Sequence, residues 1–426
     1  MPRSLHAWIP FAAFALAACE ANVNIEPPTD DPRTGPGTDV DTGPPPPPQY
    51  LLPGGVFTQD GAVVYVDVTA TIDESVSVDL EEALSLGVGI PAFGVNPFAP
   101  GTFLIGRSDE PSVERWRVSE KGVFSQDEAF SMANLGMQNA TGVRNPLHFV
   151  SATEAYFFDV LTFQIVPFDP SKMILAGPPI SLDGLMEGDL VVRGNIVHWD
   201  GERFILSVRY FREDGTSPPL GRVVFFDPST GTVTYATEEV CGNLASSILS
   251  EDGAVYFASH TSQAVLYSGG FAGDPASKPC MVRIQDGASG FDDDWYLDLG
   301  AVVGQPAGFV FPGSGTTAYV LAFDDETTPV TPENVTLLTS LGIWNYFAVD
   351  LSAAEPSAMP VLDLPPSSAF GAAFIVEEGT PRVEIPMLGV VADDFSTTTY
   401  FDITDPSAFA ERFTVPGFGL GAIRIR

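Results

Sequence analysis

Basic residues are scarce in this sequence. Its 426 residues include 19 Lys and Arg against 55 Asp and Glu, which gives a formal net charge of −36 at pH 7. A field of this sign repels the phosphates of nucleic acid and an anionic membrane surface, so we expect no nucleic-acid partner. The same field attracts a cation or a cationic partner, although acidity also keeps a protein soluble in a crowded extracytoplasmic space.

Long apolar runs and the familiar catalytic motifs are also missing. The apolar stretch at residues 7–16 is too short to span a bilayer, which takes about 20 residues, and no other run is longer. The sequence contains no His-Glu-x-x-His, Gly-x-Ser-x-Gly, Gly-Lys-Ser/Thr or Gly-x-Gly-x-x-Gly motif. Catalysis therefore has no support in the sequence, which favours a non-enzymatic binding or scaffold role.

The N-terminus has the pattern of an export signal. Arg3 precedes the apolar stretch, and Leu16-Ala17-Ala18-Cys19 resembles the bacterial lipobox, although an ordinary secretory signal is the alternative. We predict a lipoprotein signal peptide at 1–18 and lipidation of Cys19, and the following Glu20 favours delivery to the outer membrane. Residues 19–49 are rich in Pro and Asp, which predicts a disordered linker between the lipid and the folded part.

One short pattern recurs along the rest of the chain. An apolar strand reaches an acidic residue, a polar turn follows, and a second strand begins, as in VVFFDPSTGTVTYA from Val223. The spacing of about 56 residues indicates a repeat architecture. The acidic residues that mark the seven copies are Asp67, Glu120, Asp169, Asp227, Asp286, Asp350 and Asp402.

Each interval has room for four short strands, and four strands repeated seven times predict an all-β fold, a seven-bladed β-propeller over residues 50–426. The acidic turn should join the third and fourth strands of each blade, where its carboxylate can accept backbone N–H bonds. We expect residues 421–426 to supply the inner strand of the first blade and so close the ring. In an alternative register, Asp79 is the first acidic repeat residue and residues 51–57 form the inner strand of the first blade.

Three cysteines occur in the whole sequence, and two remain if Cys19 is lipidated. Cys241 and Cys280 lie on either side of the predicted fifth blade. An exported chain favours a disulfide between them, and two separate free thiols are the alternative.

Candidate ligand-binding residues come from the scarce His and from a concentration of basic residues. His148, His198 and His260 fall in three successive predicted blades near inner strands. They form either a cluster that faces the ring axis or separate histidines with structural roles. Eleven basic residues lie between Arg107 and Arg222. They form either an anion-binding patch, for which the candidates are Arg144, Arg193 and Arg203, or local ion pairs with acids.

Two motifs bear on cofactors and metals. DPSTGTVTY (227–235) resembles the tryptophan-docking repeat of quinoprotein propellers, but Tyr235 replaces the Trp and no second copy keeps Thr-Gly. We therefore expect no cofactor. The carboxylates Asp292, Asp293 and Asp294 suit either calcium or a solvated acidic loop, which leaves the metal content unknown.

With the lipobox, linker and repeats in view, three further phrases carry a resemblance: TPENVTLLTSLGIWNYFAVDL (331–351), DDFSTTTYFDIT (393–404) and the terminal RIR. The chain resembles the propeller lipoproteins of myxobacteria associated with myxochelin-type siderophore uptake. The resemblance implies an accessory role in iron acquisition at the outer membrane, with a ferric siderophore or an outer-membrane receptor as partner. It carries no ligand motif, and ferric catecholates are anionic whereas this chain is acidic. A propeller hydrolase or lyase and a surface interaction module remain alternatives.

Overall fold

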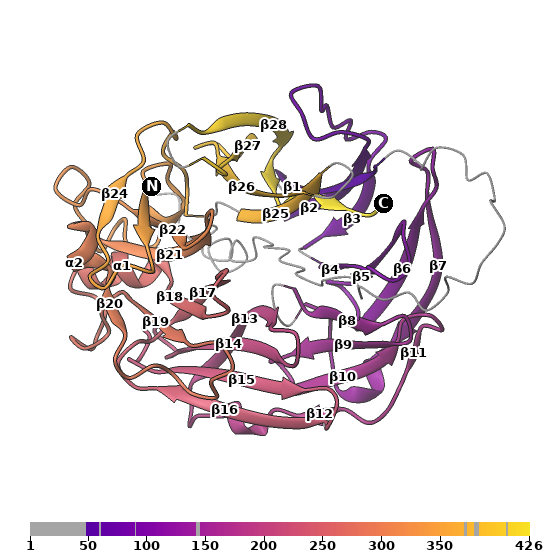
Figure 1. Ribbon diagram of the computed structural model, residues 1–426, viewed down its shortest axis with the longest axis horizontal. Helices are drawn as coiled ribbons and strands as arrows, with labels where there is room; N and C mark the ends of the chain where they lie inside the picture. The colour runs from indigo at the N-terminus through magenta and orange to yellow at the C-terminus, as the bar shows by residue number, and fades with distance from the viewer. Residues whose placement is uncertain are drawn as a thin grey trace, which may run out of the picture.

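The computed structural model describes residues 48–58, 61–89, 91–141, 145–369, 373–378, 383–405 and 408–426. The described chain is a ring of seven antiparallel sheets, a seven-bladed β-propeller (Figure 1), as the repeats predicted. The predicted signal peptide, Cys19 and nearly all of the predicted linker lie outside the described residues. Gln49, the last residue of that linker, is buried, and its side chain donates to the carbonyl of Ser119 in the second blade.

Every blade has the same order of strands from the ring axis outward. The innermost strands are β29 Phe418–Gly419 with β30 Ile423–Arg424, β4 Ala92–Val95, β8 Leu147–Ser151, β13 Val191–Trp199, β17 Leu244–Leu249, β21 Ala307–Pro312 and β25 Ala373–Glu378. The second strands are β1 Tyr50–Thr58, β5 Thr102–Gly106, β9 Glu154–Asp159, β14 Phe204–Phe211, β18 Val255–Ser259, β22 Thr317–Ala322 and β26 Val383–Val391.

The two outer strands complete each sheet. The third strands are β2 Gly61–Thr69, β6 Ser112–Val118, β10 Gln164–Asp169, β15 Gly221–Asp227, β19 Cys280–Ile284, β23 Asn345–Asp350 and β27 Thr397–Asp402. The outermost are β3 Leu84–Val88, β7 Phe124–Ser131, β11 Ile174–Leu175 with β12 Ile180–Ser181, β16 Thr232–Glu238, β20 Tyr296–Asp298, β24 Ala358–Pro360 and β28 Ala410–Pro416.

The helices of the described chain are short. They are α1 Thr261–Ser268, α2 Leu299–Val303 and the 3-10 turns Ala133–Leu135, Asp183–Leu185 and Leu338–Ser340. None of the helices within the described ranges is long and apolar enough to cross a membrane.

The acidic repeat residues occupy the predicted place. Four of them end the third strand, at Asp169, Asp227, Asp350 and Asp402. Glu120 and Asp286 follow the third strand by two residues, and Asp67 lies two residues before the end of β2. The carboxylates of Asp169, Asp227, Asp350 and Asp402 each accept a hydrogen bond from the backbone N–H two residues further on, at 2.8 to 3.0 Å. These short side chains hold the turn that lets the outermost strand begin.

Continuous apolar runs form the strands because each sheet is buried on both faces. In the β14–β15 pair, Leu206 and Val224 pack toward the third blade, while their neighbours Ile205 and Val223 pack toward the fifth. Because side chains alternate between the two faces of a strand, each strand contributes to two separate apolar interfaces. The core consists of these interfaces between neighbouring blades.

The C-terminal residues close the ring (Figure 1). Strand β30 pairs antiparallel with β1, Leu51 opposite Ile423, and β29 pairs with the same strand, Gly54 opposite Gly419. The predicted closure is confirmed, with pairing that starts at Phe418, three residues before the predicted segment. The alternative register is wrong, because β1 is the second strand of its blade.

A disulfide joins Cys241 and Cys280, with 5.7 Å between the Cα atoms. This confirms the predicted pairing. Cys280 begins β19 inside the fifth blade and does not flank it as the count of repeats had placed it. The bond therefore ties the segment entering the blade to its third strand.

Candidate functional site

The three histidines occupy separate positions in the fold. His148 lies in β8, His198 lies in β13, and His260 follows β18 and caps the N-terminus of α1 by accepting from the N–H of Ser262 at 2.9 Å. The ring of His198 contacts Ser247. The backbone N–H of His260 donates to the carbonyl of Asn243, which precedes Ser247 by four residues. Four strand residues span about 13 Å, so the structure does not bring all three rings together.

Burial keeps two of these rings neutral. Loss of solvation lowers the pKa of His148 to about 4, and the same cause, with repulsion from the protonated form of His148, lowers the pKa of His198 to about 4. The Nε2 atom of His198 lies 2.8 Å from Oγ of Ser247 in the next blade, and Nε2 of His148 lies 2.6 Å from the carbonyl oxygen of Asn145. The ring of His198 therefore links two neighbouring blades, whereas the ring of His148 bonds the loop that leads into its own strand.

The candidate arginines are also apart. Arg144 lies outside the described residues. Arg193 is near the start of β13, exposed, and donates to the carbonyl of Val192, whereas Arg203 follows the far end of that strand. Six residues of strand separate Arg193 from Trp199, which is about 20 Å. The two guanidinium groups are thus at opposite faces of the ring and do not share one ligand.

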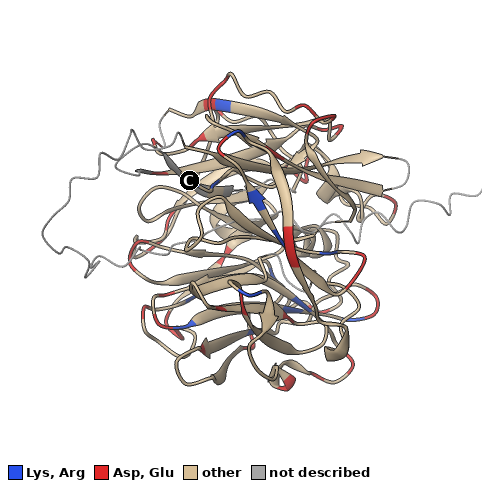
Figure 2. Cartoon of the chain, turned by 90° about the vertical axis from the view of Figure 1, so that its right-hand side faces the viewer, with Lys and Arg blue, Asp and Glu red and all other residues tan. Residues whose placement is uncertain are grey.

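Most of the basic cluster is paired with acids. Salt bridges of 2.7 to 3.0 Å join six of the eleven basic residues to carboxylates: Arg107, Arg115, Arg117, Lys172, Arg203 and Arg222. Figure 2 shows acidic residues gathered in turns at strand ends, with basic residues among them. The structure therefore favours local ion pairs over a single anion-binding patch.

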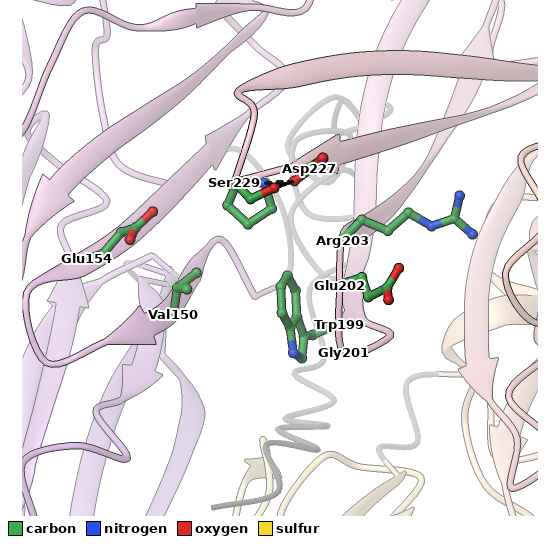
Figure 3. Close-up of a pocket in the computed structure, with 9 residues that line it drawn as sticks. Val150, Glu154, Trp199, Gly201, Glu202, Arg203, Asp227 and Ser229 are labelled. Atoms are coloured by element: carbon green, nitrogen blue, oxygen red, sulfur yellow. Dashed lines mark hydrogen bonds between the residues drawn. The ribbon is translucent and has the colours of Figure 1, made fainter. Parts of the chain in front are cut away.

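A pocket of about 530 Å³ opens between the third and fourth blades (Figure 3). Three turns on one face of the ring, which we call the turn face, form it: the β8–β9, β13–β14 and β15–β16 turns. The lining residues are Val150, Glu154, Trp199, Gly201, Glu202, Arg203, Asp227, Pro228 and Ser229. We call it the blade 3–4 pocket.

Local turn chemistry shapes the wall at the β15–β16 turn. Oδ1 of Asp227 accepts from the N–H of Ser229 at 2.8 Å and from its hydroxyl at 2.7 Å. Hydrogen bonds from Ser229 and then Thr230 hold the pKa of Asp227 below its usual range. Gly231, at a φ of +69°, then lets the chain return into β16. The pocket thus uses a repeat turn whose first role is architectural.

The wall at the β13–β14 turn is built around Trp199 and Arg203. Asp200 accepts from the backbone N–H of Arg203 and, through its other oxygen, from Nε of the same residue, both at 2.8 Å. The guanidinium also donates to the carbonyl of Ala288 and stacks 4.5 Å over Phe225. In Figure 3 it points away from Trp199, so its charge is used outside the pocket.

Trp199 and Glu154 face the pocket from neighbouring blades (Figure 3). The indole of Trp199 packs at 4.5 Å against Phe204 and remains partly exposed. Glu154 accepts at 2.6 Å from the hydroxyl of Tyr156, and burial together with this bond raises the pKa of that phenol. An aromatic face and a carboxylate thus lie across one pocket.

The sequence alone did not single out this pocket. It predicted Asp227 as a turn residue, and it singled out neither Trp199 nor Glu154. The available signal was that both acidic residues and Trp199 sit at hairpin turns of consecutive repeats. Turns at the same position in neighbouring blades lie on one face of a propeller.

The acidic loop at 292–294 is held by hydrogen bonds of its own. Asp292 forms an ion pair with Arg283 at 2.7 Å and accepts from the side chain of Gln285 at the same distance. Within the described ranges, no group of three or more His, Cys, Asp or Glu side chains is placed to hold a metal ion.

Solved structures resemble this chain at low sequence identity. No protein-family model and no curated protein sequence matches the chain. A hypothetical selenium-binding protein from Sulfolobus tokodaii shares 11% identity at a TM-score of 0.50, covering 89% of this chain and 94% of its own. A protein from Lactobacillus plantarum shares 12% identity at a TM-score of 0.48, with 89% and 100% coverage. The Aleuria aurantia lectin, described as a six-bladed propeller with fucose recognition, shares 12% at 0.36, with 86% and 96% coverage.

Proposed function

We propose that this chain is a non-enzymatic binding propeller, held at the bacterial outer membrane by a lipid on Cys19 and accessory to siderophore-iron uptake. The observation that carries the binding role is the blade 3–4 pocket, whose volume is in the range of small-molecule sites. The iron role follows from the resemblance to the siderophore-associated propeller lipoproteins.

The state of the charged groups in the pocket supports binding over catalysis. Arg203 is held by Asp200 and by the carbonyl of Ala288, and Glu154 is bonded to Tyr156. A general acid at neutral pH needs a raised pKa, whereas hydrogen bonds from Ser229 and Thr230 lower the pKa of Asp227. Charges fixed in this way suit a preformed recognition surface.

The disulfide supports an extracytoplasmic location of the protein. Bonds between cysteines persist in oxidising compartments and are rare in the cytosol. The Cys241–Cys280 bond is thus consistent with the predicted signal peptide and lipobox. Because ferric catecholates are anionic and the chain carries a net charge of −36, contact with a receptor is the accessory role that its electrostatics favour over direct carriage of the complex.

Gene deletion under iron limitation tests the proposal. We expect a strain without the gene to take up less siderophore-bound iron, and the wild-type gene to restore uptake. A Cys19→Ser gene should not restore it, and its product should leave the membrane fraction. Equal uptake with and without the gene would refute the iron role. Membrane retention of the Cys19→Ser protein would refute the lipid anchor.

A further inference from the structure

We propose that the blade 3–4 pocket binds an organic cation, held between the indole of Trp199 and the carboxylate of Glu154. This inference rests on the proposed binding role and names the chemistry of its ligand. A quaternary or primary ammonium group is the chemical class that the pocket fits. Three features carry the argument: the aromatic wall, the carboxylates and the position of the one arginine.

The aromatic wall is the partly exposed indole of Trp199. Its packing against Phe204 at 4.5 Å sets the ring in place before any ligand arrives. Trp is the aromatic side chain whose face attracts cations most strongly. A preset ring loses little conformational entropy on binding, so more of this attraction appears as affinity.

The carboxylates lie on the walls around that ring. One oxygen of Glu154 accepts from Tyr156, and a carboxylate has lone pairs for further donors. Asp227 sits on a second wall, where its lowered pKa keeps it ionised near neutral pH. Two fixed negative charges in a half-enclosed space favour a positive ligand over a neutral one of the same shape.

Among the described residues that line the pocket, Arg203 is the one arginine, and it does not offset these charges. Its guanidinium forms an ion pair with Asp200, whose side chain is 10% exposed, and it is directed away from Trp199 (Figure 3). An anion entering the pocket would therefore meet carboxylates without a free positive partner on the part of its lining that the structure describes. The net charge of −36 adds a long-range field that raises the local concentration of cations.

A matched pair of probes tests the charge requirement. Choline and its uncharged isostere 3,3-dimethylbutan-1-ol each give one nine-proton methyl resonance, so both can be titrated into the full-length protein by ligand-observed NMR at constant ionic strength. We expect choline to bind about fivefold or more tightly than the isostere. Equal or tighter binding of the isostere would overturn the inference, and so would the absence of choline binding.

Two variants and a control locate the site. Glu154→Gln keeps the acceptor for Tyr156 but removes the charge, and Trp199→Leu removes the aromatic face; each should weaken choline binding about three- to fivefold. Glu213→Gln makes the same charge change on an exposed residue at the opposite face of the fourth blade and should leave binding unchanged. If Trp199→Leu does not fold, Glu154→Gln alone decides. Wild-type affinity in Glu154→Gln would contradict the assignment.

The two proposals fail separately. If the protein shows no preference for choline but iron uptake still depends on the gene, only the proposed class of ligand is overturned. Choline binding that requires Glu154, in a strain with unchanged iron uptake, supports the ligand class and overturns the iron role.

Discussion

Leu51 and Ile423 lie opposite each other in one antiparallel ladder, although almost the whole propeller separates them in sequence. Leu51 is fully buried, and it shares one apolar cluster with Phe103 of the second blade and Phe418 of the closing segment. The backbone N–H of Ile425 also donates to the carbonyl of Gln49 at 2.9 Å. Ring closure thus joins the two ends of the described chain and the second blade.

The first prediction is that the C-terminal residues are required for folding. Deleting residues 421–426 removes β30, exposes the edge of β1 and uncovers apolar surface on the neighbouring blades. We expect the melting temperature to fall by more than about 10 °C, or no folded protein to form. Circular dichroism during heating measures this. Deleting residues 20–47, which are part of the predicted linker at 19–49, is the control, and a truncated protein as stable as this control would contradict the closure.

The second prediction concerns the disulfide. Cys241 and Cys280 are 39 residues apart, and a bond that closes a loop of this length stabilises a fold by about 4 kcal/mol in the chain-entropy model. We expect the double variant Cys241→Ser with Cys280→Ser to lose much of this free energy of unfolding in a denaturant titration. Reductant should destabilise the wild type and leave the double variant unaffected. A wild-type protein indifferent to reductant would show that the bond contributes nothing.

The third prediction is an acid-dependent loss of stability from His198. Its side chain is 2% exposed, and its pKa is lowered from 6.5 to about 4. Because the unfolded chain binds the proton first, stability is full above pH 6.5 and declines as the pH falls toward 4, by up to about 3 kcal/mol. His198→Gln should flatten this part of the curve. Denaturant titrations at several pH values test it, and parallel curves for the two proteins would refute it.

The fourth prediction concerns the junction between the third and fourth blades. The side chain of Asn145 accepts from the N–H of Val197 at 2.8 Å and donates to the carbonyl of the same residue at 3.1 Å. This junction lies at the point in β13 where the register shifts. Asn145→Ala leaves both backbone groups buried without that partner, so we expect a loss of about 2 kcal/mol.

The measurement for Asn145→Ala is the free energy of unfolding, with Asn145→Asp as a partner variant. Asp keeps an acceptor for the Val197 N–H but places a carboxylate against its carbonyl, so it should also destabilise the protein. A wild-type free energy for Asn145→Ala would mean that the hydrogen bonds between these blades add nothing to stability.

Local patterns were sufficient to predict the blades. Asp169 and Asp227 bond the N–H two residues ahead, which is a property of a few consecutive residues and can be read wherever the pattern recurs. The alternation that sends Leu206 to one interface and Ile205 to the other is equally local. The closing strand and the disulfide followed from one further argument each: an open sheet edge needs a partner, and two isolated cysteines in a chain that is predicted to be exported are expected to pair.

The sequence by itself determined the repeats, the acidic turns, the disulfide pair and the closing segment, because each depends on residues adjacent in the chain or on a pairing with few alternatives. Only the tertiary structure decided which side chains from different strands and turns face one another. Trp199 and Glu154 line one pocket because the hairpin turns of consecutive blades lie on one face, and Arg193 and Arg203 are far apart because one strand carries them to opposite faces. The physical reason is that strand register and the rotation between blades set side-chain positions, and these are properties of the closed ring.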